Sequence, residues 1–159
     1  MASAALKNQP RAGPAQRLIL ERFLPYRLSI LSNRISRAIA KRYAKTFGLT
    51  IPEWRIIAVL GRRPGLTAKE VTEATEMDKV AVSRAVAKLA AAKRVFADVR
   101  DDDGRAQSLS LTAQGETLYA RIAPIALESE RRLLASLDVR ERAELDALLD
   151  RLLEAAREL

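Results

Sequence analysis

The 159-residue chain contains no cysteine and no histidine. A chain without cysteine forms no disulfides, has no thiolate metal sites and senses no redox change through a thiol. A chain without histidine also lacks a common zinc ligand and the side chain most often used as a general base at neutral pH. Only six glycines are present, and no glycine-rich phosphate-binding loop is found. We therefore expect a protein that is not an enzyme and that requires neither a metal nor a cofactor.

Long hydrophobic runs are also absent. No segment reaches the roughly 20 consecutive apolar residues that a membrane-spanning helix requires, and the N-terminal residues do not follow the pattern of a signal peptide. The sequence therefore predicts a cytoplasmic protein with no membrane partner. Apolar residues nevertheless make up 48% of the chain, which is enough to form a packed core without crosslinks.

Positive charge is abundant and unevenly distributed. The net charge is +8, and residues 1–49 carry ten Lys or Arg but one acidic residue. Between Lys79 and Ala97 there are five basic residues and no acidic one. Charge sorted in this way suits a surface that faces phosphates, although a solvated helix face is the simpler alternative.

The first apolar pattern predicts a long helix near the N-terminus. Its members recur at spacings of four, three, four and four, which places them on one face of a helix from about Leu24 to Phe47. They are Leu24, Leu28, Leu31, Ile35 and Ile39. Gly48 is expected to end this helix in the left-handed conformation that glycine adopts easily.

Two further helices are expected at the C-terminus. Thr112 is positioned to cap a long helix, which Pro124 is expected to bend because proline removes a backbone hydrogen bond. Asp138 and Glu141 form a capping box that opens the last helix. That helix carries its own apolar stripe, formed by Leu145, Leu148, Leu149, Leu152 and Leu153.

Short elements fill the middle of the chain. The capping boxes T-I-P-E from Thr50 and T-A-K-E from Thr67 predict helices that reach about Arg62 and Thr75. Asp78 is expected to cap a third helix that ends near Arg94. The apolar period then becomes two, with Val95, Ala97 and Val99 before an Asp-Asp-Asp-Gly turn and Gln107, Leu109 and Leu111 after it. This alternation predicts a β-hairpin.

A helix, a tight turn, a second helix and a hairpin, in this order, form a winged helix-turn-helix. We therefore predict a mainly α-helical protein with a small β-hairpin. Residues 50–112 are predicted to form a winged helix-turn-helix DNA-binding domain, and residues 23–49 and 113–159 a helical dimerisation domain. Residues 1–22 are interpreted as an N-terminal arm.

The helix after Asp78 is predicted to enter the major groove of DNA. The residues that point outward, opposite Val82, Val86 and Leu89, include Lys79, Val80, Ser83, Arg84 and Lys88. Arg84 is the candidate for a bidentate contact to guanine, while Lys79 and Ser83 are expected to contact bases or phosphates. Lys88 and Arg94 are assigned to phosphates. The small residues Ala81, Ala85 and Ala87 are expected to let this helix approach DNA closely.

The hairpin tip is predicted to reach the minor groove. Arg105 is interpreted as the probe, and Asp103 as the carboxylate that orients its guanidinium group. Gly104 supplies the permissive backbone between them. The alternative for this segment taken alone is an ordinary solvated Asp-Gly turn.

The sequence resembles the multiple antibiotic resistance regulator (MarR) family of bacterial transcription factors. The resemblance is carried by LTAKEV from Leu66, DKVAVSRAVAKL from Asp78 and the D-x-R motif from Asp103, which runs into LSLT from Leu109. It implies an obligate homodimer that binds inverted repeats in double-stranded DNA and is associated with the nucleoid when bound. It also implies a repressor that a small ligand releases from DNA, with Arg105 and Asp103 in the wing. The basic N-terminal region is not a general feature of the family.

The apolar stripes of the terminal helices also predict dimerisation, since the small DNA-binding domain cannot cover them. The alternative, which the sequence also allows, is that each chain buries its own stripes. A polar stripe containing Ser29 and Asn33, with Trp54 as an apolar wall, is interpreted as an effector pocket, although close helix packing is the alternative. The basic residues of the first helix favour an anionic effector, such as an aromatic carboxylate or an acyl-CoA, or else help to steer DNA.

Two other functions remain open. A winged helix can serve as a protein–protein interaction module, because fold alone does not determine function. Such a module is expected to present large apolar or aromatic side chains, whereas the outward face here is mainly basic and small. A constitutive DNA-binding regulator without an effector is the second alternative.

Overall fold

The computed structural model describes residues 17–99 and 107–159. The chain divides into two units, Met1–Arg34 and Ile35–Leu159. The described part of the first unit contains a 3₁₀ helix, Leu20–Arg22, and the beginning of α1 (Leu24–Phe47). Eight large hydrophobic side chains of this unit, from Leu18 to Leu31, are exposed. The predicted long helix is therefore present, and its N-terminal apolar stripe is not buried within this chain.

In the second unit, α1 ends as its sequence predicts. Gly48 has a positive φ of 62°, and its N–H donates to the Ala44 carbonyl at 2.9 Å. Thr50 then forms the expected capping box with Glu53 and opens α2 (Ile51–Arg62). Helix α2 provides much of the core, because Ile56, Ile57 and Leu60 are fully buried. It packs against α3, α4, α5 and β3.

Helices α3 (Ala68–Thr75) and α4 (Lys79–Ala91) follow α2. Thr67 and Glu70 form the second predicted capping box. A tight turn joins α3 to α4, and Glu76 takes the left-handed conformation there with φ 49°. The Asp78 side chain accepts hydrogen bonds from the Val80 and Ala81 N–H groups and so caps α4.

Helix α4 ends earlier than its sequence predicts. Its last residue is Ala91, not Arg94. The Lys93 N–H donates to the Ala90 carbonyl and the Arg94 N–H donates to the Leu89 carbonyl, while Lys93 has φ 54°. These two bonds form a Schellman motif, which usually has glycine at the left-handed position. Lysine occupies that position here, so the sequence gives no signal for the helix end.

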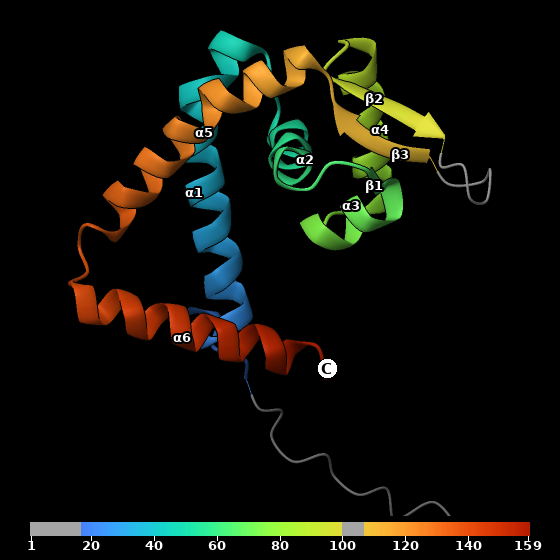
Figure 1. Ribbon diagram of the computed structural model, residues 1–159. Helices are drawn as coiled ribbons and strands as arrows, with labels where there is room; N and C mark the ends of the chain where they lie inside the picture. The colour runs from blue at the N-terminus through green and yellow to red at the C-terminus, as the bar shows by residue number, and fades with distance from the viewer. Residues whose placement is uncertain (1–16, 100–106) are drawn as a thin grey trace, which may run out of the picture. The chain divides into compact units, whose positions relative to one another are not determined.

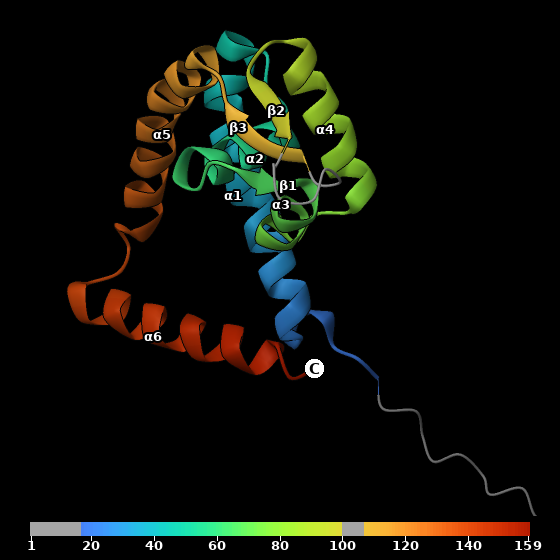
Figure 2. The same cartoon turned by 45° about the vertical axis from the view of Figure 1, so that its right-hand side comes forward.

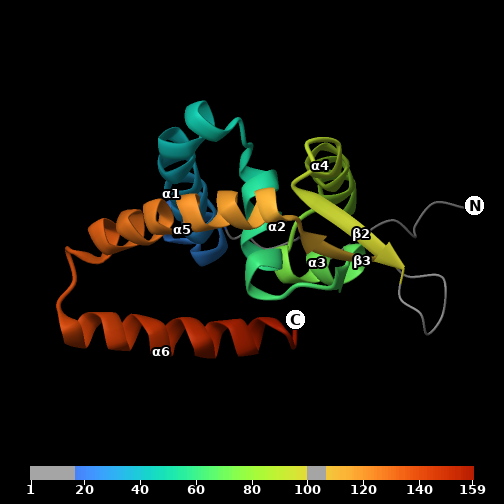
Figure 3. The same cartoon turned by 45° about the horizontal axis from the view of Figure 1, so that its top comes forward.

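A three-stranded antiparallel sheet completes the domain, in the order β1-β3-β2. Strands β2 (Val95–Val99) and β3 (Gln107–Leu111) have the predicted bounds, and their register pairs Val95 with Leu111. The two strands extend together beside α4 (Figure 3). The third strand, β1 (Leu66–Thr67), was missed by the sequence analysis because two residues are too few to show an alternating pattern. It pairs with β3 (Figure 1).

The chain ends in α5 (Ala113–Leu134) and α6 (Val139–Ala156). The Thr112 side chain accepts from the Gly115 N–H and caps α5, which continues through Pro124 along a curved path (Figure 2). Asp138 and Glu141 form the third predicted capping box and open α6. No residue of α6 is buried. The described helices include none with the length and hydropathy needed to cross a membrane.

Candidate nucleic-acid interface

Helix α4 has two faces of opposite character. Val82, Ala85 and Leu89 are buried in the core. The opposite face carries side chains that are all exposed, at offsets of zero, one, four, five and nine from the start of the helix: Lys79, Val80, Ser83, Arg84 and Lys88. The predicted outward face is therefore available to a partner. One detail of the prediction is wrong, because Ala85 is 4% exposed and packs into the core instead of facing DNA.

The cations of this face are not neutralised by neighbouring carboxylates. Helix α4 contains no acidic residue. Salt bridges lie on α3 (Lys69–Glu73), on α5 (Glu128 with Arg131 and Arg132) and near the C-terminus (Glu154–Arg157), and none of these involves Lys79, Arg84 or Lys88. Exposed cations without internal partners keep their charge available for phosphate oxygens or base edges.

The rest of the domain holds α4 firmly. Helix α4 packs against α2, α3 and β2. Its buried residues belong to the same hydrophobic core as Ile56, Ile57 and Val71. A helix fixed at its cap and along its inner face loses little backbone conformational entropy on binding.

The two strands of the wing are anchored at their base. Val95, Leu109 and Leu111 are buried. The Thr112 N–H donates to the Arg94 carbonyl at 3.1 Å, and the Thr112 hydroxyl donates to the Lys93 carbonyl at 2.6 Å. The predicted tip residues, Asp103 and Arg105, lie outside the described residues, so their assignment stays a prediction.

Arg94 makes an internal contact that the sequence did not reveal. Its Nη2 atom donates to the Phe47 carbonyl, at the end of α1, at 3.0 Å. The remaining N–H groups of the guanidinium are not committed to that bond. The assignment of Arg94 to a DNA phosphate is untested.

The predicted effector residues lie in two different units and are described separately. In the first unit, Asn33 and Ser29 are exposed, and the Asn33 amide donates to the Ser29 hydroxyl at 3.5 Å. In the second unit, the Trp54 ring stacks on Tyr119 with centroids 6.3 Å apart and tilts against Tyr43 at 5.9 Å. Trp54 thus packs between two aromatic rings, and its role as a pocket wall stays a prediction.

Two further features characterise the cluster of Tyr43, Trp54 and Tyr119. A Cβ atom on Gly61 would lie 2.8 Å from the Tyr119 ring, so glycine leaves the space that this ring occupies. Burial raises the pKa of the Tyr43 hydroxyl to about 12, while the nearby Arg55 cation acts in the opposite direction. Tyr43 therefore remains neutral at physiological pH and contributes to the core as an uncharged side chain.

A contact between α1 and α5 was also missed by the sequence analysis. The Arg42 Nη1 atom donates to the Ser129 hydroxyl at 2.8 Å and to the Ile125 carbonyl at 3.2 Å. Arg42 was interpreted with the other basic residues of α1 as an attraction for an anionic effector. Pairwise contacts 83 and 87 residues apart in the chain leave no periodic signal, so reasoning from local pattern does not reach them.

Comparison with known proteins agrees with this geometry. The MarR family model matches residues 47–106. A helix-turn-helix transcriptional repressor from Mycobacterium tuberculosis is 28% identical over 131 residues, which cover 82% of this chain and 91% of the repressor. A MarR/EmrR family transcriptional regulator from Acinetobacter sp. ADP1 has a similar crystal structure, with a TM-score of 0.81 and 28% identity over 89% of this chain and 100% of that one.

A third relative shares the fold. The structure of the S. aureus MepR–DNA complex matches with a TM-score of 0.73 at 22% identity, covering 84% of this chain and 98% of that one. The family comprises transcription regulators and not enzymes. The match of residues 47–106 to the MarR family model, the similarity to the repressor and the shared fold together support a winged-helix, DNA-binding transcriptional regulator of the MarR type.

Proposed function

We propose that the protein is a homodimeric, sequence-specific repressor that binds an inverted-repeat operator and is released by a small ligand. Residues 50–112 form its DNA-binding domain in this proposal, and residues 23–49 and 113–159 its dimerisation domain. The observation that carries the DNA-binding part is the exposed basic face of α4, whose cations have no ion-pair partner among the described residues, opposite a face buried at Val82, Ala85 and Leu89. Selection of genomic DNA fragments by the purified protein tests it, because a sequence-specific repressor enriches one inverted motif.

The position of Arg84 suits it to read a base. It is exposed, has no ion-pair partner among the described residues and lies one turn into a helix whose N-terminal part is rigidly capped. A planar guanidinium group donates two parallel hydrogen bonds to the O6 and N7 atoms of guanine. Lys88 lies about one turn further along the helix and is assigned to a phosphate, a contact that contributes affinity without sequence preference.

Replacing Arg84 with alanine is expected to remove the preference for one base pair in each half-site, at a cost of roughly 1–3 kcal/mol in binding. The affinity for DNA with that base pair changed should fall much less. Gel-shift titrations at fixed salt measure both. Lys88→Ala is the matched control, because it removes the same charge but should weaken all sequences about equally. Equal weakening by Arg84→Ala would assign Arg84 to a phosphate.

Val80 is an unusual residue on a DNA-facing surface. It is apolar, 54% exposed and surrounded on the helix face by Lys79, Ser83 and Arg84. Among the groups displayed in the major groove, the C5 methyl of thymine is the one that an aliphatic side chain recognises. We therefore assign Val80 to a thymine methyl group.

Deoxyuridine, which lacks only that methyl, tests this assignment. Placing deoxyuridine at the critical thymine is expected to weaken wild-type binding about fourfold, from the roughly 0.8 kcal/mol attributed to one buried methylene-sized group. Val80→Ala should weaken binding to thymine-containing DNA and lose most of the sensitivity to deoxyuridine. A double-mutant cycle isolates this coupling. Full deoxyuridine sensitivity in Val80→Ala would place the methyl contact on another residue.

The wing and the effector complete the proposal. Arg105 is assigned to the minor groove and Asp103 to its orientation, on the basis of the family motif. An anionic effector near Ser29, Asn33 and Trp54 is proposed to lower DNA affinity. A protein with unchanged operator binding in the presence of all tested aromatic acids and their CoA esters would instead be a constitutive regulator.

A further inference from the structure

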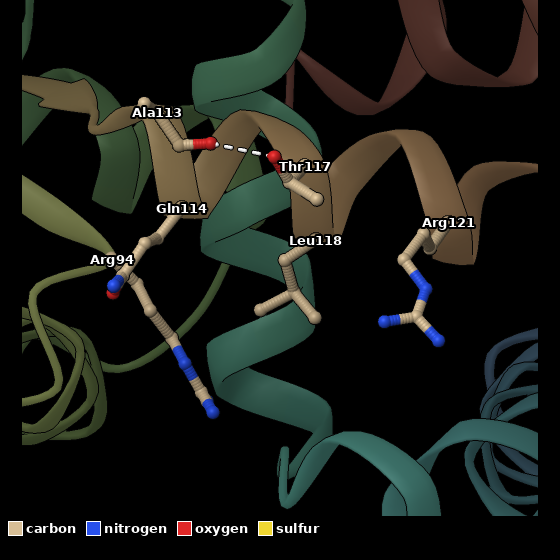
Figure 4. A pocket seen from close by; sticks show the side chains of 6 residues that line it. All are labelled: Arg94, Ala113, Gln114, Thr117, Leu118 and Arg121. Atoms are coloured by element: carbon tan, nitrogen blue, oxygen red, sulfur yellow. Dashed lines mark hydrogen bonds between the residues drawn. The ribbon is translucent and has the colours of Figure 1, made fainter.

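A hollow lies beside the first half of α5, and none of the outward residues of α4 lines it. Its volume is about 400 Å³, within the range of small-molecule sites. Its lining comes from the α4–β2 connection and from α5, and consists of Arg94, Ala113, Gln114, Thr117, Leu118 and Arg121. Figure 4 shows the two arginine side chains on either side of Leu118.

Both guanidinium groups are held by the same residue, Phe47, at the end of α1. Arg94 donates to its carbonyl oxygen at 3.0 Å. The Arg121 Cζ atom lies 4.8 Å from the centre of its ring, which is a cation–π arrangement. Each contact leaves several N–H donors unused, since a guanidinium carries five. The two cations are thus positioned before any ligand arrives.

Among the residues that the structure describes, no carboxylate lines this hollow. Glu128, an acidic residue of α5, lies near the far end of the helix. Its carboxylate forms ion pairs there with Arg131 and Arg132. The hydrogen bond from Arg132 is the largest cause that lowers the pKa of Glu128, and the charge of Arg131 lowers that pKa further. Glu128 is therefore engaged elsewhere, and the charge of Arg94 and Arg121 is not cancelled by the lining.

The other residues that line the hollow indicate what kind of ligand would fit between the two arginines. Leu118 is buried and supplies an apolar floor together with Ala113. The Thr117 hydroxyl donates to the Ala113 carbonyl at 2.9 Å and keeps its lone pairs for another donor (Figure 4). A purely inorganic anion would leave the apolar floor uncovered, whereas an anion on an apolar ring would cover it.

We propose that this hollow binds a small organic anion, a carboxylate or phosphate group carried on an apolar body. The anionic group accepts charge-assisted hydrogen bonds from Arg121, Arg94 is the second cation of the lining, and the body lies on Leu118. This site is distinct from the effector pocket assigned to Ser29, Asn33 and Trp54. It adjoins the base of the wing, because the Arg94 carbonyl accepts the Thr112 N–H and the Arg94 side chain reaches α1.

Calorimetric titration of the protein without DNA tests the proposal. Benzoate and phenyl phosphate are the probes, and benzamide is the neutral analogue of benzoate. At low salt we expect one benzoate or phenyl phosphate per chain, with a dissociation constant of about 1 mM or less. The tighter of the two identifies the preferred anionic group. Benzamide should not saturate the site, because it provides no charge for the arginines.

Variants of α5 locate the site. Arg121→Ala is expected to weaken binding of the preferred probe at least about tenfold. Arg131→Ala removes the same charge from the same helix and should leave binding unchanged. Arg121 is exposed, so its loss, which includes one cation–π contact with Phe47, should change the melting temperature only slightly. Equal binding by Arg121→Ala, equal binding of benzamide or the absence of saturable binding overturns the proposal. None of these results depends on DNA binding.

Discussion

Replacing Leu148 and Leu152 with glutamate is expected to convert the protein into a folded monomer and to weaken operator binding at least about 100-fold. These leucines are four residues apart on α6 and are 46% and 43% exposed within the chain. An exposed leucine contributes little to the stability of its own chain, so the double variant should still fold. Charged side chains at a two-fold interface of two apolar helices would face each other across the axis and prevent association.

The loss of affinity follows from the loss of the second half-site. In a dimer, binding of one recognition helix brings the other close to its half-site, so the second contact forms at a high effective concentration. A monomer binds each half-site independently. Sedimentation equilibrium measures the association state, and gel-shift titration with an inverted repeat measures the affinity.

A charge-matched control is available on the same helix. Ala143 and Ala147 are also four residues apart and exposed, but they lie opposite the leucine stripe of α6. Ala143→Glu with Ala147→Glu adds the same charge and should leave both the dimer and DNA binding nearly unchanged. A wild-type protein that sediments as a monomer at micromolar concentration, or a leucine double variant that still forms dimers, would contradict an interface on α6.

Local sequence signals predicted most of the helices and both long strands. The three capping boxes work within four residues, because a Thr or Asp side chain and a Glu side chain satisfy N–H groups of the same turn. The strand bounds follow from alternation over five residues. What escaped prediction lacked such a local signal: a two-residue strand, and the end of α4 at a left-handed lysine, Lys93.

The candidate site divides in the same way. The outward face of α4 is predictable because the helical period places Lys79, Ser83 and Arg84 on one side. The error at Ala85 arose because alanine is small and mildly apolar, so composition does not decide which way it faces. The pairing of Arg94 and Arg121 around Phe47 depends on how three segments pack, and it had no sequence signal.

Gly115 is the position where a single added methyl group should damage the second unit most. It lies in the first turn of α5, and a Cβ atom there would lie 2.1 Å from the Arg94 carbonyl oxygen. That oxygen belongs to the backbone and cannot rotate away as a side chain would. It also accepts the Thr112 N–H at 3.1 Å, while the Arg94 N–H donates to Leu89 at 2.8 Å. A shift of this backbone would therefore disturb both the end of α4 and the base of the wing.

Gly115→Ala is accordingly expected to lower the free energy of unfolding by about 2–4 kcal/mol. In an ordinary helix the same change raises stability by roughly 0.5–1 kcal/mol. The sign of the change in unfolding free energy therefore shows whether the steric contact at Gly115 dominates. Urea denaturation at fixed protein concentration measures the effect, because dimerisation would make stability depend on concentration.

Gly48→Ala is the matched control for Gly115→Ala. Gly48 has nothing within 4 Å of an added Cβ, but its φ of 62° is unfavourable for alanine. Its cost should therefore be limited to about 1–2 kcal/mol of backbone strain. A larger loss at Gly115 identifies the steric contact with Arg94 as the cause, since both variants add the same methyl group. If Gly115→Ala were as stable as the wild type or more stable, α5 would be able to move away from the Arg94 backbone at low cost. The contact between α5 and the base of the wing would then not be rigid.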